Sequence, residues 1–239
     1  MKHFRLERKE VSDEGWLAVL NTSTFSDVCG QESLWLHPDE LDYYHEIKAD
    51  KRRCSYILGR ICAKTCYQKV CNAKNPSTIH IKTGILKDPI LQNQTKTTWQ
   101  TGITHSNTMA AALVFPATHP LAIDVEEWDT QRTQVMKSQC DPLELNLLLD
   151  LGLSVDVSCA ICWTAKEAIS KALRTGRTTS FRLFELKSIH RHEDGGYAGL
   201  FSQYHQYQFR SWVIENKVLS IVLPKRTRIL FTDGEPRLS

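Results

Sequence analysis

Apolar residues recur along the chain at two spacings, one typical of strands and one typical of helices. These spacings divide the chain into predicted strands and helices. Short apolar stretches and two-residue alternation, typical of strands, occur at residues 15–20, 78–82, 99–104, 109–115, 121–126, 181–189, 207–214 and 218–223. Apolar residues at helical spacing and helix-start signals predict a helix that begins at about Pro38, and further helices over about 51–71, 142–152 and 154–174. Residues 215–217 predict a hairpin turn, and the residues after about Lys225 read as a polar tail.

Two of these helices begin in the same way. Pro38 and Pro142 each stand at the first helical position and are followed two residues later by a glutamate, which is a common helix start. The two starts lie about one hundred residues apart, and the neighbouring strands and helices recur at a similar offset, as in a duplicated unit. The alternative is that such starts are common anywhere, since the identity between the halves is low. A duplication places the boundary in the turn-like segment 116–120, giving subdomains 1–117 and 118–239.

The composition is that of a globular protein and argues against several functional classes. Among 239 residues, 41% are hydrophobic and 24% charged, as in ordinary globular proteins. The net charge of +3 is too small for a general nucleic-acid binder. No apolar run approaches the roughly 18 residues that a membrane span needs, and the charged N-terminus is unlike a secretory signal. We therefore expect a cytoplasmic protein that binds neither nucleic acid nor membrane.

Eight cysteines are expected to be reduced thiols in that compartment. Cys62 and Cys66 lie in one predicted helix, and Cys159 and Cys162 lie in another. Because apolar residues surround them, buried structural thiols are favoured over metal ligands.

Three carboxylates on two predicted elements carry the clearest candidate chemistry. Asp124 and Glu126 share one face of a strand, and Glu167 and Lys171 share one face of a helix. Oxygen ligands from two elements, with a lysine nearby, suit a divalent cation that faces a phosphate. Each pair also has a plain alternative: a solvated acidic strand face, or a surface salt bridge on the helix. Lys166 points about 100° away and is expected at the surface or at the edge of a ligand.

Two further segments offer groups for an anion. His105 follows Thr104 at the end of a predicted strand, where it could donate to a phosphate oxygen or belong to a capped turn. A run of basic residues begins the second helix. Cations at a helix N-terminus oppose the helix dipole, so their position is easier to explain if an anion binds near them. The alternative is that these side chains are simply solvated. This run consists of Lys51, Arg52 and Arg53, with Arg60 as a further candidate.

Taken together, the chain resembles the surfactin-type 4′-phosphopantetheinyl transferases. Residues 122–126 (Ala-Ile-Asp-Val-Glu) and 163–171 (Trp-Thr-Ala-Lys-Glu-Ala-Ile-Ser-Lys) match the two specific motifs of that family in order and spacing. Residues 103–106 (Ile-Thr-His-Ser) and the basic helix start that ends in Leu-Gly-Arg at residue 60 support the match. At 86–89 (Leu-Lys-Asp-Pro) the chain departs from the family, because Asp88 stands where a phosphate-binding lysine is usual and Lys87 is shifted by one position.

The resemblance implies an α+β fold: a pseudo-twofold pair of similar subdomains, each a small antiparallel sheet packed with helices, with a cofactor cleft between them. It also implies the reaction, in which the phosphopantetheinyl arm of coenzyme A moves to a serine of an apo acyl or peptidyl carrier protein and 3′,5′-ADP leaves.

The roles of individual residues follow from the same resemblance. Mg²⁺ would be held by Asp124, Glu126 and Glu167. Catalysis would involve Asp124, Glu167 as a possible base and Lys171 on the phosphate. Coenzyme A would be bound by Lys51, Arg52, Arg53, Lys87, Thr104, His105 and Lys171.

An acidic carrier protein suits the weakly positive chain, and residues 130–137 are expected to form a docking loop. A duplication within one chain favours a monomer. Two other functions remain open at this point. One is a carrier-binding module with impaired catalysis, and the other is a different Mg²⁺-dependent phosphotransferase.

Overall fold

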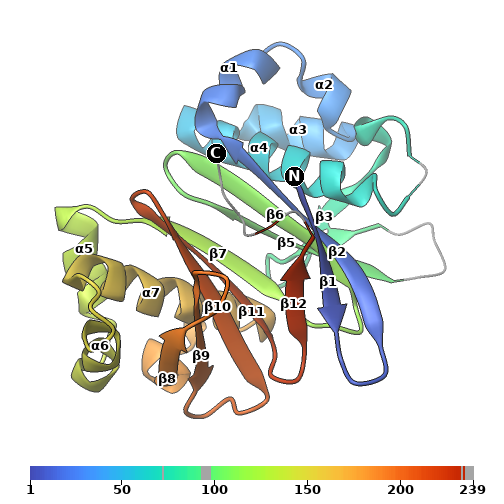
Figure 1. Cartoon of the computed structure of the whole chain (residues 1–239). Helices are drawn as coiled ribbons and strands as arrows, with labels where there is room; N and C mark the ends of the chain where they lie inside the picture. Colours follow the sequence, from blue (N-terminus) through green and yellow to red (C-terminus); the bar gives the residue numbers. More distant parts are fainter. Residues whose placement is uncertain (72, 93–97, 233, 235–239) are drawn as a thin grey trace.

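Two five-stranded antiparallel sheets form the middle of the molecule (Figure 1). The computed structural model describes residues 1–71, 73–92, 98–232 and 234. The first sheet has the order β12 (Arg228–Phe231), β1 (Lys2–Glu7), β2 (Ser12–Asn21), β6 (Met109–Pro116) and β5 (Trp99–His105). The second has the order β7 (Ala122–Glu127), β11 (Lys217–Pro224), β10 (Tyr207–Ile214), β9 (Tyr197–Phe201) and β8 (Leu186–Arg191).

Helices cover the outer face of each sheet (Figure 1). The first half supplies α1 (Phe25–Val28), α2 (Glu32–Trp35), α3 (Pro38–Glu46) and α4 (Asp50–Tyr67). The second half supplies α5 (Thr130–Lys137), α6 (Pro142–Leu149) and α7 (Val155–Ala172). Short 3₁₀ helices connect these elements: η1 (Thr22–Thr24), η2 (Pro76–Thr78), η3 (Gly176–Thr178) and η4 (Phe181–Phe184).

The two faces of the central strands pack against different cores, and this produces the layered arrangement of the molecule. In β6, Ala110, Ala112 and Val114 face the core beneath α4, whereas Leu113 and Phe115 face a core between the two sheets. β11 alternates in the same way between a core beneath α7 and the central core. Side chains of successive residues leave opposite faces of a strand, so each of these strands contributes to two cores and the order of layers is helix, sheet, sheet, helix.

The fold is therefore α+β with two similar halves, each an antiparallel sheet packed with helices, as the sequence predicts. The predicted starts of α3 and α6 are also present, because Glu40 and Glu144 each close a capping box. Within the described residues, none of the helices is both long and apolar enough to cross a membrane.

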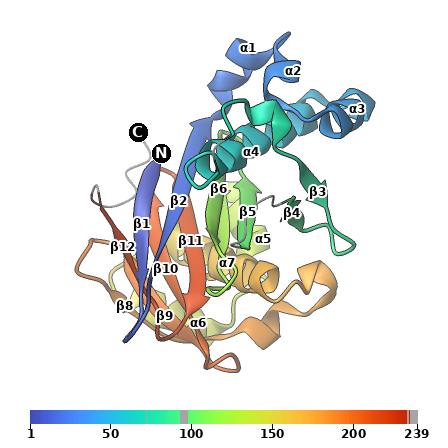
Figure 2. The same ribbon diagram turned by 90° about the vertical axis from the view of Figure 1, so that its right-hand side faces the viewer.

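A small hairpin of β3 (Ile81–Thr83) and β4 (Pro89–Leu91) stands apart from both sheets. In Figure 2 it projects at the side of the molecule, between the helices of the first half and the C-terminal end of α7. An ion pair between Asp88 in its turn and Arg174 just after α7, 3.5 Å apart, joins the hairpin to the second half.

Several elements differ from the predictions. β1, β9 and β12 were not predicted, and residues 181–189 form η4 and then β8 rather than one strand. The expected tail contains β12, whose Phe231 pairs in register with Phe4 of β1. The chain thus returns at its end to the first sheet. The boundary between residues 117 and 118 stays a prediction.

Two further expectations were wrong. Residues 130–137, expected as a loop, form α5, which Asp129 caps by accepting a hydrogen bond from the backbone N–H of Arg132. Lys166, expected at the surface, is 1% exposed because its ammonium donates to Glu144 Oε2 (2.7 Å) and to the carbonyl of Gln139 (2.9 Å).

The two predicted pairs, Cys62 with Cys66 and Cys159 with Cys162, are buried, as expected. Cys62 and Cys66 lie against β6, where their thiols donate to the carbonyl oxygens of Ala110 and Ala112. Burial raises the pKa of Cys62 to about 12. Such thiols are protonated packing groups rather than nucleophiles.

Candidate active site

Lys171 connects the two sequence motifs. It lies in the last turn of α7, and its ammonium donates to Asp124 Oδ1 on β7 over 2.6 Å. The same nitrogen donates to the carbonyl of Ile123 (3.2 Å) and to Thr104 Oγ1 on β5 (3.3 Å). The lysine therefore extends from its helix to strands of both sheets. The structure brings Asp124, Lys171 and Thr104 together as one site at the junction of the halves.

Asp124 is the most deeply placed group of this site, with 4% of its surface exposed. Its Oδ1 also accepts a hydrogen bond from Thr104 Oγ1 (3.0 Å), and Thr104 in turn accepts from the backbone N–H of Val125 (3.2 Å). Its Oδ2 is buried and has no hydrogen-bond partner among the described residues. Because a buried carboxylate oxygen without a partner is costly, this atom is a natural ligand for a cation.

Glu126 lies on the same face of β7 and interacts with Asp124. Burial and the negative charge of Asp124 raise the pKa of Glu126 to about 7, against the opposing effect of Arg132. Arg132 of α5 donates to Glu126 Oε2 over 2.7 Å. A carboxylate whose pKa is raised by burial and by a neighbouring carboxylate is stabilised in its ionised form by a bound cation.

Glu167 lies on α7, which packs along β7, and is 8% exposed. The three acids do not form a closed ligand set: in the described part of the chain, the one group of three metal-ligating residues with atoms within 4.8 Å of each other lies elsewhere. The assignment of Asp124, Glu126 and Glu167 as ligands of one ion thus stays a prediction.

Glu127 is a positioning residue that sequence reasoning passed over. Its Oε1 accepts hydrogen bonds from Ser106 Oγ (2.7 Å), the Thr108 backbone N–H (2.8 Å) and Thr108 Oγ1 (2.5 Å). Burial alone would raise its pKa, but these donors lower it below the usual value. The carboxylate thereby fixes the turn that follows His105. In the sequence, the two hydroxyl residues on either side of Asn107 were the feature that could have indicated this turn.

The start of α4 faces the same turn. Lys51 donates to Asn107 Oδ1 over 2.6 Å, and Arg52 Nη1 lies 3.5 Å from His105 Nε2. Loss of solvent around the ring and the positive charges of Lys171 and Arg52 lower the pKa of His105. Two cations and an imidazole thus gather beside the Asp124–Lys171 pair, an arrangement that attracts an anion.

A cavity of about 460 Å³ lies next to these groups. Its basic lining residues are Arg52, Arg60, Lys87 and His105, and its aromatic ones are Tyr43 and Tyr56. Lys87 sits in the turn of the β3–β4 hairpin with φ at 62°, a left-handed conformation. It also lines a second cavity of about 360 Å³, which is mainly apolar and includes Lys171. The hairpin therefore separates a basic cavity from an apolar one.

Arg53 is placed differently from its neighbours. Its Nε donates to the carbonyl of Ile47 (2.6 Å), and its guanidinium lies 5.9 Å from the centre of the Tyr44 ring. It does not belong to the lining of the basic cavity described above. The geometry favours Arg52 over Arg53 as an anion ligand.

One family model matches part of the chain. Residues 120–222 match the model of the 4′-phosphopantetheinyl transferase superfamily, and this range contains Asp124, Glu126, Glu167 and Lys171. No relative was found among curated proteins.

Two solved structures are similar to parts of the chain. One is a holo-(acyl-carrier-protein) synthase from Bacillus anthracis str. Ames in complex with CoA (3′,5′-ADP), with 18% identity, TM-score 0.40, and coverage of 47% of this chain and 96% of that one. The other is the holo-ACP synthase of Plasmodium yoelii, with 15% identity, TM-score 0.38, and coverage of 43% and 91%.

Proposed function

We propose that this protein is a 4′-phosphopantetheinyl transferase of the surfactin type, which moves the phosphopantetheinyl arm of coenzyme A to a serine of an apo carrier protein. The observation that carries the proposal is the contact of Lys171 with Asp124. It joins the two motifs that lie within the segment matching the superfamily model, and it does so beside a basic cavity.

Coenzyme A would extend across the β3–β4 hairpin, from the basic cavity to the apolar one. Arg52, Lys87 and His105 offer positive charge and donors for phosphates at the basic cavity. Tyr43 and Tyr56 offer ring faces for a base. Lys171, which lies at the edge of the apolar cavity, would bind the phosphate that carries the pantetheine arm. The reacting phosphorus would then lie near Lys171.

The transfer breaks one P–O bond and forms another. The serine oxygen attacks the phosphorus that bears the pantetheine arm, and the P–O bond to the second phosphate breaks, so that 3′,5′-ADP leaves with the bonding electron pair. The serine proton passes to Glu167, directly or through water. Lys171 balances the negative charge that builds on the transferred phosphoryl oxygens. Thr104 and Asp124 hold the Lys171 ammonium in place.

The acids suit Mg²⁺, which prefers oxygen ligands and few carboxylates. The partnerless Oδ2 of Asp124 and the raised pKa of Glu126 are the observations that support this fit. Asp124, Glu126 and Glu167 would hold the ion, which when bound supplies positive charge for the diphosphate oxygens.

The carrier protein would dock beside α5. This helix carries Arg132 and Lys137 together with Val135, which is 59% exposed. A mixed basic and apolar surface suits an acidic carrier. Since one chain contains both halves of the site, we propose that the monomer is the working unit.

Transfer is tested with coenzyme A labelled on its pantetheine arm, Mg²⁺ and a panel of apo carrier proteins. We expect label on the carrier serine, and none on a carrier in which that serine is alanine. Carrier binding without transfer of label would indicate a binding module. Label on a different acceptor would indicate another phosphotransferase. Either result would contradict the proposal.

A further inference from the structure

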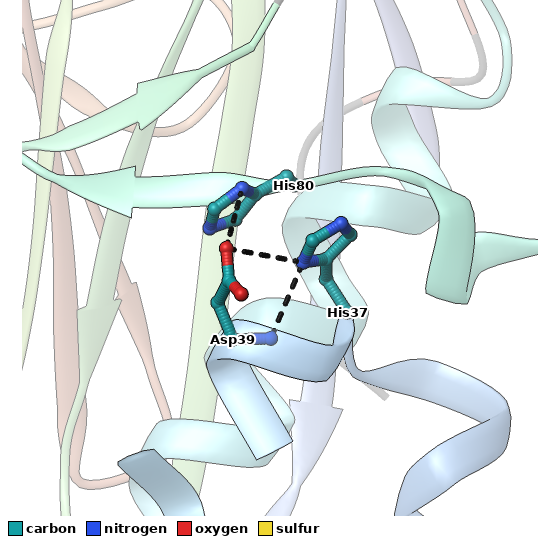
Figure 3. A group of neighbouring side chains, drawn as sticks. All are labelled: His37, Asp39 and His80. Carbon is teal, nitrogen blue, oxygen red and sulfur yellow. Dashed lines mark hydrogen bonds and ion pairs between the residues drawn. The ribbon is translucent and has the colours of Figure 1, made fainter. Parts of the chain in front are cut away.

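A second cluster of metal-ligating side chains lies away from the candidate active site. His37, Asp39 and His80 each offer a ligand atom, and these atoms lie within 4.8 Å of one another. Figure 3 shows both imidazoles facing the Asp39 carboxylate. His37 caps the start of α3, while His80 directly precedes β3 at the base of the hairpin. The cluster thus joins two segments far apart in the sequence.

The distances suit a metal better than hydrogen bonds. His37 Nδ1 lies 3.7 Å and His80 Nδ1 lies 3.5 Å from Asp39 Oδ2, which is beyond the usual hydrogen-bond range. Ligands about 2.1 Å from one tetrahedral ion are separated by about 3.4 Å. The two distances to Asp39 Oδ2 are therefore close to the separation of ligands in a tetrahedral shell, and the ligand atoms of the two imidazoles lie within 4.8 Å of each other.

We propose that His37, Asp39 and His80 form a binding site for a borderline divalent transition metal such as Zn²⁺, with water as the fourth ligand. Two imidazoles and one carboxylate select this class over Mg²⁺, which prefers oxygen ligands. The site is partly open, because His80, His37 and Asp39 side chains are 12%, 28% and 67% exposed. This access permits both entry of the ion and a bound water.

Binding requires a small local rearrangement, in which His37 Nδ1 gives up the hydrogen bond that it accepts from the Asp39 backbone N–H (3.4 Å). The rings of His37 and His80 are stacked, with centroids 4.1 Å apart and planes 2° from parallel. Because the nitrogen lone pairs lie in the ring planes, the rings must tilt toward each other to converge on one ion. The N-terminal end of α3 opposes a cation, but Asp39, the proposed carboxylate ligand, lies in its first turn and offsets this effect.

The consequence is a link between α3 and the hairpin. His80 is hydrogen-bonded to the segment that follows β4, because its carbonyl oxygen accepts a hydrogen bond from the backbone N–H of Gln92 (3.0 Å). A bound ion would therefore restrain the base of the hairpin whose turn contains Lys87. This inference does not depend on the proposed transferase function, because it concerns different residues and a different class of metal.

The test is calorimetric titration of the full-length, tag-free protein with Zn²⁺ alone, repeated in excess Mg²⁺, together with the absorption spectrum of the Co²⁺ form. We expect one equivalent bound at this site, unaffected by Mg²⁺, and a Zn²⁺-dependent rise in Tm. His80→Ala and Asp39→Asn should each weaken Zn²⁺ binding at least about tenfold.

His45→Ala is the matched control, since His45 lies exposed at the other end of α3, and it should bind like the wild type. Asp39→Asn changes a mostly exposed side chain, so it keeps the test valid should His80→Ala fail to fold. The proposal is overturned if the wild type does not bind Zn²⁺, if either ligand variant keeps wild-type affinity, or if His45→Ala loses as much.

Discussion

Glu40 and Glu144 make the same set of interactions in the two halves of the protein. Each closes a capping box by accepting from the backbone N–H at the start of its own helix, His37 for one and Asp141 for the other. Each also accepts from a backbone N–H of a more distant strand, over 3.1 Å for Glu40 and 2.7 Å for Glu144.

A buried lysine completes each set. Lys64 pairs with Glu40, and Lys166 pairs with Glu144. Each lysine also donates to the carbonyl two residues before the helix cap, at Trp35 or at Gln139. Sequence identity between the halves is low, but the same network at the same place supports a duplicated unit. In each copy the glutamate holds helix, helix and strand together.

We therefore predict that Glu40→Gln and Glu144→Gln are both strongly destabilising. The glutamates are 2% and 1% exposed, and loss of one charge leaves a buried lysine without its counterion. Breaking a buried ion pair from one side costs about 3–5 kcal/mol. Urea unfolding followed by circular dichroism measures this loss. Asp42→Asn, at an exposed position of α3, should change the free energy of unfolding by less than about 0.5 kcal/mol.

Much of the fold could be predicted because its signals are local. The capping boxes of α3 and α6 and the alternation in β7 and β11 follow from neighbouring residues. The motifs around Asp124 and Glu167 were also readable, since their spacing places each residue on a defined face of a strand or helix. These parts of the candidate site needed no knowledge of distant contacts.

The remaining parts depend on distant contacts. β12 has only four residues, and its pairing with β1 joins opposite ends of the chain. Lys166 lies on a helix within the motif at residues 163–171, and nothing near it in sequence indicates that Glu144 neutralises it in the interior. The contact of Lys171 with Asp124, rather than with a residue of its own helix, likewise requires the packing of α7 on β7.

Arg52 and Arg53 should separate ligand binding from stability. If Arg52 binds the 3′-phosphate of coenzyme A, Arg52→Ala should raise the KM for coenzyme A about 10- to 100-fold, the effect of losing one charge-assisted hydrogen bond. The KM for dephospho-coenzyme A, which lacks that phosphate, should hardly change. Steady-state kinetics with both donors measures the difference.

Arg53→Ala is the control for that prediction. Its guanidinium is used by the Ile47 carbonyl and the Tyr44 ring, so its loss should lower the free energy of unfolding by about 1 kcal/mol and leave the ratio of the two KM values unchanged. An equal rise for both donors in Arg52→Ala, or a selective effect of Arg53→Ala, would assign the phosphate contact differently.

Asp124→Ala and Glu167→Ala should each reduce transfer to about 1% of the wild-type rate or less without unfolding the protein. Asp124 holds the Lys171 ammonium and offers a free oxygen to a cation, and removal of one such electrostatic group costs about 10²–10³-fold in kcat. Lys171→Ala should weaken both coenzyme A binding and turnover. Label transfer and circular dichroism on the same samples separate activity from folding.

Asp150→Asn serves as the control for the acid variants, because Asp150 is exposed at the end of α6. Its turnover should equal that of the wild type. Near-normal turnover in Asp124→Ala or Glu167→Ala would remove these residues from the mechanism. Unchanged kinetics in Lys171→Ala would leave its contact with Asp124 a structural salt bridge.

Asp194 should make part of the stability dependent on pH. It lies in the turn between β8 and β9 and forms an ion pair with Arg210 of β10. Burial alone would raise the pKa of Asp194, but the Arg210 charge and the hydrogen bond from the Gly196 N–H lower it below its usual value. A lowered pKa means that the ionised form favours the folded state. Its contribution is present above about pH 3.9, the usual pKa of an unfolded aspartate, and is lost as the pH falls through the lower folded value.

Asp194→Asn should therefore be less stable than the wild type by about 1–3 kcal/mol near neutral pH, and the difference should shrink below about pH 4. Urea unfolding midpoints of both proteins across a pH series measure it. Glu193→Gln, a change at the exposed neighbouring position, should follow the wild type at every pH. A constant difference between Asp194→Asn and the wild type over the whole series would show that packing, rather than the ion pair, accounts for the loss.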